Sequence, residues 1–268
     1  MEPGLKTILR SLLGGGLVLA ASATSAVCAE RWGVVFLHGK SGSENQLALY
    51  DKPLAAMGFL SARPQMCWSR QRIYDKPYLD CLGAIDKAIA ALKARGAARI
   101  VVAGQSLGAN AALAYAARND KEVAGVIALA PAHYPEFISK RPEIAGEIAR
   151  ARQLAASGQG ERKTTFTDIN GGVAITVNAT PKTYLSFLAS DSPGVMPGNA
   201  ARLKVPLLVV SGTKDKSQRG KDYIFGRAPA DAMNRYVTVA ADHRDTPKAG
   251  REAVLTWLRD LQGKKQGK

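Results

Sequence analysis

The sequence predicts an α/β fold built on a mainly parallel sheet. Short apolar, β-branched runs alternate with segments of helical periodicity through nearly all of residues 30–262, which is the pattern of βαβ units. The chain has 268 residues, of which 46% are hydrophobic and 22% charged, a composition typical of a globular protein that buries a sizeable core. We therefore expect residues 30–262 to form one α/β domain.

The strands of this sheet are predicted from short apolar runs bounded by polar or glycine residues. The first run ends at His38-Gly39, the second is weaker, and the last precedes a polar loop. The predicted strands are residues 33–37, 60–68, 99–103, 123–129, 207–211 and 236–240.

Helical spacing of apolar residues predicts the connecting helices. Residues 78–95 carry such a pattern and are followed by Gly96, a typical helix stop; residues 107–118 are rich in alanine, and 250–261 form a closing helix. The tail at 263–268 is polar and basic, and we expect it to be frayed.

An insertion at about 134–203 separates the strand that ends near residue 130 from the one that starts near 205. It is too long for a structureless loop in a compact domain. Residues 143–156 have a helical pattern, and 164–169 and 173–177 flank Asn-Gly-Gly, which predicts a β-hairpin.

Residues 1–29 have the pattern of a secretory signal: a basic start, an apolar run and small residues before Ala29. Cleavage after Ala29 would give a periplasmic or secreted protein. The alternatives are an uncleaved anchor and a lipid-modified Cys28, although the residues before Cys28 do not resemble a lipobox. In an oxidising compartment the remaining cysteines, Cys67 and Cys81, are candidates for a disulfide worth about 3 kcal/mol, with buried free thiols as the alternative.

The formal charge of +15 permits anionic partners, but the basic residues are spread along the chain rather than clustered with aromatic ones. We therefore expect no nucleic-acid partner and at most weak association with an anionic envelope surface. Three histidines and three cysteines are too few for a zinc-finger or iron–sulfur framework, so neither a metal nor another cofactor is expected.

Residues 104–108, Gly-Gln-Ser-Leu-Gly, lie between a predicted strand and a predicted helix. This is the setting of a G-x-S-x-G nucleophile elbow, where a tight turn exposes the serine hydroxyl above the sheet. Ser106 is the candidate nucleophile. A serine needs a base, and among the three histidines His243 comes late in the chain, after the last strand, as the order serine, acid, histidine requires.

The acid that orients His243 should lie between Ser106 and His243, at the carboxyl end of a strand. Asp215 fits, because a short loop connects it to the buried strand at 207–211. Glu136 is the runner-up, and Asp242 is awkwardly close to the histidine. The backbone N–H groups of Leu107 and, in the loop after the first strand, Lys40 are the expected oxyanion donors.

The motifs at 38–40, 104–108, 211–215 and 242–243, in this order and spacing, resemble those of the serine α/β-hydrolase superfamily. The resemblance covers residues 31–262 apart from the insertion. It implies the α/β-hydrolase fold, with a parallel sheet of about six strands, helices on both faces and the insertion as a cap or lid. The antiparallel strands that often begin this fold are expected to be missing here.

Several residues are candidates for the substrate pocket because of their place near the predicted strand ends or in the cap. They are His38, Gln105, His133 and Tyr184. The Lys40 side chain is expected either to be solvated or to attract an acidic substrate.

The resulting hypothesis is a monomeric, exported serine hydrolase without a cofactor that cleaves a small-molecule or lipid-like carboxylic ester through an acyl-enzyme. Thioester or amide hydrolysis by the same residues is an alternative. Another is a non-catalytic protein that binds the envelope through its positive charge.

Overall fold

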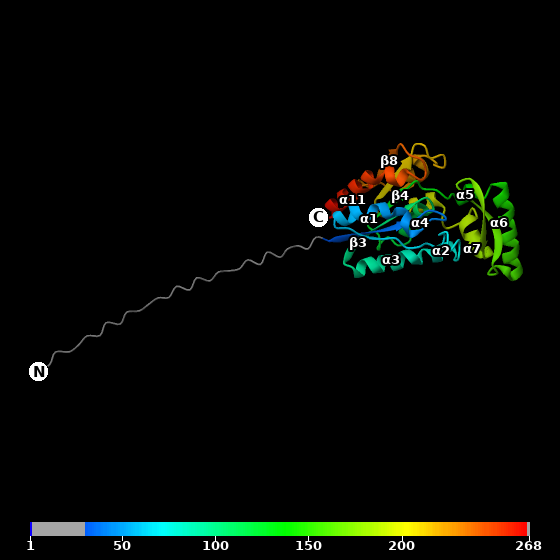
Figure 1. Ribbon diagram of the computed structural model, residues 1–268, viewed down its shortest axis with the longest axis horizontal. Coiled ribbons are helices and arrows are strands. Elements are labelled where there is room, and N and C mark those ends of the chain that lie inside the picture. Colours follow the sequence, from blue (N-terminus) through cyan, green and yellow to red (C-terminus); the bar gives the residue numbers. More distant parts are fainter. Residues whose placement is uncertain (2–29, 267–268) are drawn as a thin grey trace.

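The computed structural model describes Met1 and residues 30–266, so nearly all of the predicted signal segment lies outside the described residues. At the centre is a six-stranded sheet in the order β2-β1-β3-β4-β7-β8, and all its neighbouring strands are parallel (Figure 1). The strands are β1 (Arg31–Leu37), β2 (Leu60–Ala62), β3 (Ala97–Gln105), β4 (Gly125–Leu129), β7 (Leu207–Gly212) and β8 (Arg235–Val239).

Helices cover both faces of this sheet, as the sequence predicts. The helices outside the insertion are η1 (Glu44–Tyr50), α1 (Asp51–Ala56), α2 (Tyr78–Cys81), α3 (Gly83–Ala94), α4 (Leu107–Ala116), α9 (Lys221–Ile224), η3 (Phe225–Arg227), α10 (Thr246–Ala249) and α11 (Arg251–Gln266). Because successive side chains of a strand point to opposite faces, β1 contributes to two separate cores.

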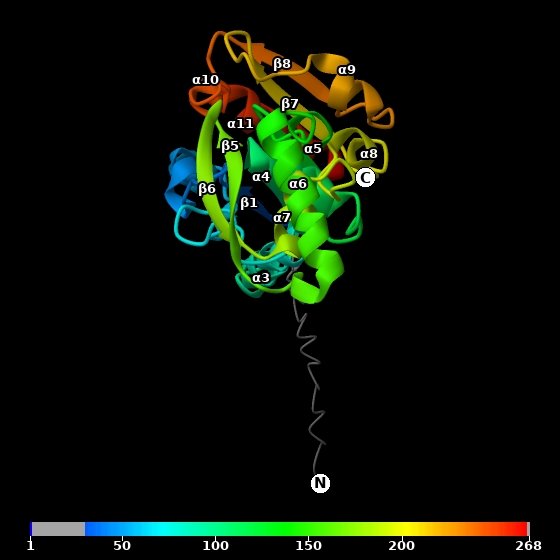
Figure 2. The ribbon, with the colours of Figure 1, turned by 90° about the vertical axis from the view of Figure 1, so that its right-hand side faces the viewer.

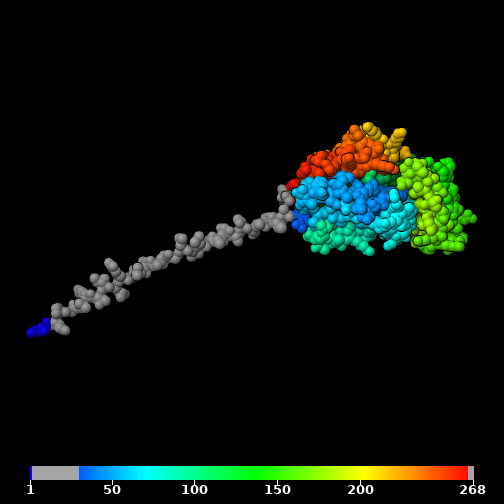
Figure 3. Space-filling model, viewed as in Figure 1, coloured from blue at the N-terminus to red at the C-terminus, as the bar shows by residue number. Residues whose placement is uncertain are grey.

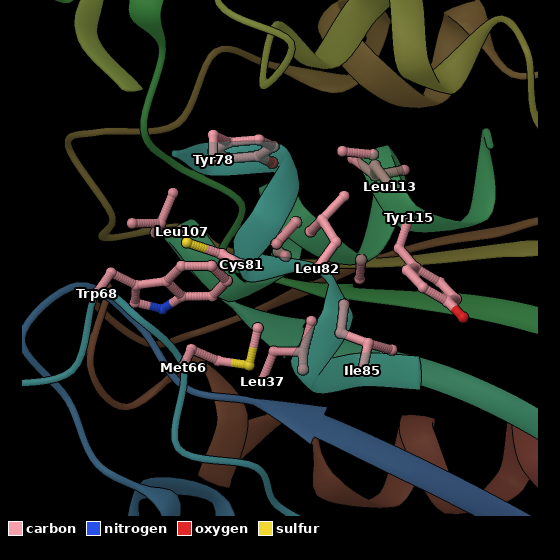
Figure 4. Close-up of a cluster of buried hydrophobic side chains, with 14 of the residues drawn as sticks. Leu37, Met66, Trp68, Tyr78, Cys81, Leu82, Ile85, Leu107, Leu113 and Tyr115 are labelled. Carbon is pink, nitrogen blue, oxygen red and sulfur yellow. The ribbon is translucent and has the colours of Figure 1, made fainter. Parts of the chain in front are cut away.

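One core contains Val35 and Leu37 of β1, together with side chains of α3 and α4 such as Ile85 and Leu113 (Figure 4). The other contains Val34 and Phe36 with side chains of η1, α1 and α11. Fully burying one such aliphatic or aromatic side chain contributes about 1.5–3 kcal/mol. Both faces of β1 are therefore held, which fixes the loop that follows its carboxyl end.

The insertion forms a cap at one end of the molecule (Figures 1 and 3). Its elements are α5 (Pro135–Ile138), α6 (Pro142–Leu154), η2 (Ala155–Gln159), β5 (Thr164–Asn170), β6 (Val173–Ala179), α7 (Pro181–Leu188) and α8 (Met196–Ala200). The predicted hairpin is present, with β5 and β6 antiparallel. Figure 2, which views the molecule from the cap end, shows β5, β6 and α6 in front of the central sheet.

Most elements differ from their predicted bounds by one to three residues, and three regions differ more substantially. β2 is an edge strand of three residues rather than a strand through residue 68; Pro64 follows it, and proline cannot donate to a strand ladder. The helix predicted over 78–95 is divided at Leu82 into α2 and α3. The predicted frayed tail is wrong over its first part, because α11 continues to Gln266.

Cys67 and Cys81 form the predicted disulfide, with their Cα atoms 5.6 Å apart. It connects the loop after β2 to α2, and both cysteines are buried in the core that also contains Leu37 and Ile85, where Figure 4 labels Cys81. Within residues 30–266, none of the helices combines the length and apolar character needed to cross a membrane.

Candidate active site

Ser106 occupies a sharp turn between β3 and α4. Its backbone has φ 56° and ψ −119°, outside the regions that residues with a side chain normally adopt. The turn is held by the N–H of Ser106, which donates to the carbonyl of Leu129 at 3.0 Å. A strained conformation maintained by its surroundings is typical of functional sites. It places a half-buried serine at the carboxyl edge of the sheet and the start of a helix.

The two glycines of the elbow are required by close packing rather than by their backbone angles. A Cβ added at Gly104 would lie 2.2 Å from the carbonyl carbon of Gly108, and one added at Gly108 would lie 2.1 Å from the carbonyl oxygen of Leu37. Real Cβ atoms do not approach other heavy atoms so closely. The glycines therefore let β3, α4 and the end of β1 meet around Ser106.

Asp215 and His243 are joined by a hydrogen bond at the carboxyl edge of the sheet. Nδ1 of His243 lies 2.8 Å from Oδ2 of Asp215, whose other oxygen accepts from the N–H and hydroxyl of Ser217 at 2.8 and 2.6 Å. Asp215 is buried, whereas the His243 side chain is 33% exposed. A carboxylate at Nδ1 holds the proton there and leaves Nε2 free to accept another.

Burial alone would raise the pKa of Asp215, but the hydrogen bonds from His243 and Ser217 outweigh it and hold the pKa below its ordinary value. The carboxylate is therefore ionised at neutral pH. The runners-up make other contacts: Glu136 accepts from the hydroxyl of Tyr223, and Asp242 accepts from the N–H groups of two residues in the following turn.

The elbow and the His243 loop are in direct contact. Nε2 of the Gln105 amide donates to the carbonyl oxygen of His243 at 2.9 Å, and Gln105 immediately precedes Ser106. Within the described part of the chain, the Ser106 hydroxyl and the His243 ring are not hydrogen-bonded to each other. The structure thus brings the predicted nucleophile and base to one edge, and leaves the hydroxyl without a protein partner.

The loop after β1 lies against the elbow, as expected for an oxyanion site. A Cβ at Gly39 would be 3.3 Å from the Cβ of Ser106. Among the described residues, the backbone N–H groups of Lys40 and Leu107 donate to no protein group. The N–H of Leu107 lies at a helix N-terminus directly after Ser106, and that of Lys40 lies in the adjoining loop, so both are suited to bind a negative charge that develops next to the predicted nucleophile.

The sequence matches no protein-family model and no curated protein. The structure is similar to that of a monoacylglycerol lipase from Paleococcus ferrophilus, with a TM-score of 0.64 and 18% identity, covering 85% of this chain and 94% of the lipase. It is also similar to Est1E from Butyrivibrio proteoclasticus, solved with ferulic acid, with a TM-score of 0.59 and 15% identity over 87% and 90% of the two chains. A thioesterase domain from the curacin biosynthetic pathway matches with a TM-score of 0.55 and 16% identity over 86% and 92%.

The chain has the α/β-hydrolase fold. The expected departure is present as well, because in the described residues the sheet of this hydrolase fold consists of parallel strands alone. Its elbow, the loop after β7 and the loop after β8 carry Ser106, Asp215 and His243 respectively.

The Lys40 side chain is neither solvated nor available to attract an acidic substrate, which were the two expectations from the sequence. It is 8% exposed, and its ammonium donates to both oxygens of Asp168, at 3.0 and 2.7 Å, and to the carbonyl of Ile169 at 2.9 Å. Asp168 is fully buried in β5 and also accepts from the Tyr74 hydroxyl at 2.7 Å. Lys40 therefore connects the loop after β1 to the cap hairpin, and its charge is neutralised rather than offered to a substrate.

Burial would raise the pKa of Asp168, but the charge of Lys40 and the hydrogen bonds from Lys40 and Tyr74 outweigh it and keep the pKa below its ordinary value. In return, burial and the neighbouring Asp168 carboxylate raise the pKa of Tyr74 well above its usual range. The cluster thus holds one carboxylate, one ammonium and a neutral phenol at pH 7.

His38 and Gln105, two of the pocket candidates, hold backbone segments together. Nδ1 of His38 donates to the carbonyl of Gly39 at 2.8 Å, and Nε2 accepts from the N–H of Met66 at 3.0 Å, so neither ring nitrogen of this buried residue is free for a ligand. Burial lowers its pKa, which keeps the ring neutral. The Gln105 amide bridges His243 and Gln46.

The other two pocket candidates are also buried. The Tyr184 hydroxyl donates to the carbonyl of Thr167 at 2.6 Å and its ring stacks on Phe166, so it belongs to the cap core. His133 follows β4 with φ 68°, and its Nε2 donates to the carbonyl of Phe187 at 2.9 Å. Burial and then the charge of Lys40 lower the pKa of His133 to about 3. Its Nδ1 has no partner among the described residues.

Sequence reasoning missed Asp168, Tyr74, Gln46 and Ser217. Asp168 alone had a local signal, since it shares the inward face of β5 with the buried Phe166. An aspartate in that position requires a buried cation or several donors. Within the described residues, no group of three or more His, Cys, Asp or Glu side chains is arranged to hold a metal ion.

Proposed function

We propose that this protein is a serine hydrolase that cleaves a carboxylic ester through an acyl-enzyme intermediate. The observation that carries the proposal is the combination of the strained Ser106 elbow with the hydrogen bond from His243 to Asp215. The same geometry serves an ester, a thioester or an amide, so the substrate class is the part that experiment must decide.

In the first half-reaction the Ser106 oxygen bonds to the carbonyl carbon while its proton passes to Nε2 of His243. The carbonyl electron pair moves onto oxygen, which accepts hydrogen bonds from the N–H groups of Lys40 and Leu107. When the pair returns, the bond to the alkoxy group breaks, and the alkoxy oxygen takes the proton from Nε2. The alcohol leaves and Ser106 carries the acyl group.

In the second half-reaction water replaces the alcohol. His243 removes a proton from water as the oxygen bonds to the acyl carbon, and the Ser106 oxygen then leaves and recovers that proton. The products are the carboxylic acid and the free enzyme. Throughout, Asp215 holds Nδ1 protonated and stabilises the imidazolium formed in each step.

We also propose that the chain is exported and cleaved after Ala29. The disulfide between Cys67 and Cys81 supports this, because such bonds persist in oxidising compartments. Fractionation of cells that express the full chain, followed by mass spectrometry of its N-terminus, tests the proposal. A mature chain that begins at Glu30 outside the cytoplasm is expected, and an intact N-terminus in the cytoplasm would contradict it.

The function is tested with matched p-nitrophenyl esters of increasing acyl length, the corresponding coenzyme A thioesters and p-nitroanilides. We expect ester hydrolysis by the wild-type chain and its loss in Ser106→Ala, with both chains showing the same circular dichroism and thermal midpoint. Faster cleavage of the thioesters or anilides would reassign the substrate class. Undiminished hydrolysis by Ser106→Ala would reject the mechanism.

A further inference from the structure

Two glutamine side chains connect the three loops that carry the proposed chemistry. The N–H of Gly39 donates to Oε1 of Gln46 at 3.0 Å, Nε2 of Gln46 donates to Oε1 of Gln105 at 2.5 Å, and Nε2 of Gln105 donates to the carbonyl of His243 at 2.9 Å. The chain of bonds begins beside the oxyanion donor Lys40, passes the residue next to Ser106 and ends on His243 itself.

The direction of this chain is fixed by its two ends. A backbone N–H can only donate, so the oxygen of the Gln46 amide must face Gly39. A backbone carbonyl can only accept, so the nitrogen of the Gln105 amide must face His243. With both ends set, the Gln46 nitrogen meets the Gln105 oxygen, and every bond is satisfied in this one arrangement. Turning either amide over would place two N–H donors against each other at one of its contacts and two oxygen acceptors against each other at the other.

The surroundings keep the two amides in place. Gln105 is 3% exposed, so an unpaired polar atom there would carry a desolvation cost. Gly42 leaves the space that Gln46 needs, because a Cβ at this position would lie 2.1 Å from Oε1 of Gln46. The space taken by the Gln46 amide, rather than the backbone angles of residue 42, therefore explains why this residue is a glycine.

We propose that Gln46 and Gln105 are positioning residues, which set the His243 loop and the oxyanion loop relative to Ser106 as one unit. The inference rests on the proposed serine hydrolase function. Neither side chain touches the reacting atoms. Their effect is on the placement of groups that do, and a displacement of about 1 Å in such groups can lower a rate by about a hundredfold.

Gln46→Glu is the first test, because residue 46 is exposed and the substitution preserves its shape. A carboxylate can accept from Gly39 but cannot donate to Gln105. Gln105 must then turn over to donate to the carboxylate, which places its oxygen against the carbonyl of His243. We expect kcat, and the rate of fluorophosphonate reaction at Ser106, to fall by about tenfold to a hundredfold with little change in KM.

The chain offers a matched control in a second glutamine pair, in which Nε2 of Gln65 donates to Oε1 of Gln71 at 2.7 Å on the exposed surface. Gln65→Glu makes the same chemical change in a pair whose amide side chains hydrogen-bond to each other and to none of the three loops. Its kcat and its probe reaction rate should equal those of the wild type.

Gln105→Glu separates positioning from simple loss of structure through its pH profile. The new carboxylate cannot donate to the His243 carbonyl, but once protonated its hydroxyl can. Burial raises the pKa of a carboxyl group, so protonation should occur in mildly acidic solution. The rate of Gln105→Glu relative to wild type should therefore rise as the pH falls. The corresponding ratio for Gly42→Ala, which displaces the Gln46 amide without adding a titrating group, should be low and independent of pH.

Equal rates in wild type, Gln46→Glu and Gly42→Ala, with the wild type reactive, would overturn the positioning role while leaving the proposed function intact. A Gln105→Glu ratio that does not change with pH would also overturn it. No reaction of the wild-type chain with any ester or with the probe would overturn both proposals.

Discussion

Asp215 and Asp168 are both buried carboxylates whose pKa is held below its ordinary value, but their partners differ. Asp215 bonds to His243, whose side chain is 33% exposed. Asp168 bonds to Lys40, which is 8% exposed, and both members of that pair are enclosed between the cap and the loop after β1. A pair that moves protons needs one partner within reach of substrate, whereas a pair that holds two segments together does not.

The comparison predicts different consequences for the same substitution. Asp215→Asn should lower kcat by about ten-thousandfold, because the amide no longer holds His243 in the tautomer with a free Nε2. Its thermal midpoint should change little. Asp242→Asn is the control, since it alters the carboxylate next to His243 in sequence but its Oδ1 can still accept from the backbone. A loss of less than tenfold for Asp215→Asn would place the acid elsewhere.

Asp168→Asn should act on stability instead. It leaves the Lys40 ammonium buried without a counter-charge, which we expect to lower the free energy of unfolding by about 3–5 kcal/mol in urea titrations. Adding Lys40→Met removes the unpaired charge, so the double variant should regain a large part of the loss. Strictly additive effects of the two substitutions would show that the pair is not coupled.

The disulfide between Cys67 and Cys81 should contribute somewhat less to the free energy of unfolding than the Lys40–Asp168 pair does, and it supports the same loop after β1. It braces residues 66–70, whose backbone bonds hold the loop after β1: the N–H of Ser41 donates to the carbonyl of Trp68 at 2.9 Å, and the N–H of Arg70 to that of Gly42 at 3.1 Å. Replacing Cys67 and Cys81 by serine should lower the free energy of unfolding by about 3 kcal/mol. An unchanged urea midpoint relative to the oxidised wild type would contradict this expectation.

His133 adds a pH-dependent term next to the Lys40–Asp168 pair. Its pKa is lowered to about 3, so the unfolded chain binds a proton that the folded chain excludes, and stability should fall as the pH drops below about 6.5. The slope from this residue is at most about 1.4 kcal/mol per pH unit. His38, whose pKa is also lowered, contributes with the same sign.

His133→Asn should reduce that slope between pH 6.5 and 5 without removing it, because asparagine tolerates the left-handed backbone at this position. The carboxylates with lowered pKa values lose their stabilising effect only at lower pH, so this window isolates the histidines. Unfolding titrations at several pH values measure the slope. An unchanged slope would show that His133 does not contribute to it.

The difference between the Asp215–His243 pair and the Lys40–Asp168 pair also explains which parts of the site could be predicted from the sequence. Ser106 and Asp215 follow buried strands and His243 follows the edge strand β8, so a local pattern places all three at one edge of a parallel sheet. The bond between Lys40 and Asp168 spans 128 positions and joins a core loop to a hairpin, and no periodicity encodes such a contact. The predicted extent of the edge strand β2 is too long for a related reason, because Met66, Cys67 and Trp68 are apolar for packing and disulfide formation rather than for strand pairing.

The most direct test of the account is to treat the purified mature protein with a fluorophosphonate probe and locate the modified residue by mass spectrometry. The probe reports an activated serine without requiring the natural substrate. We expect labelling confined to Ser106 in the wild type and absent in His243→Ala, with both chains folded. Folded wild-type protein that carries no label at Ser106, or equal labelling in His243→Ala, would contradict the assignment of a serine activated by this histidine.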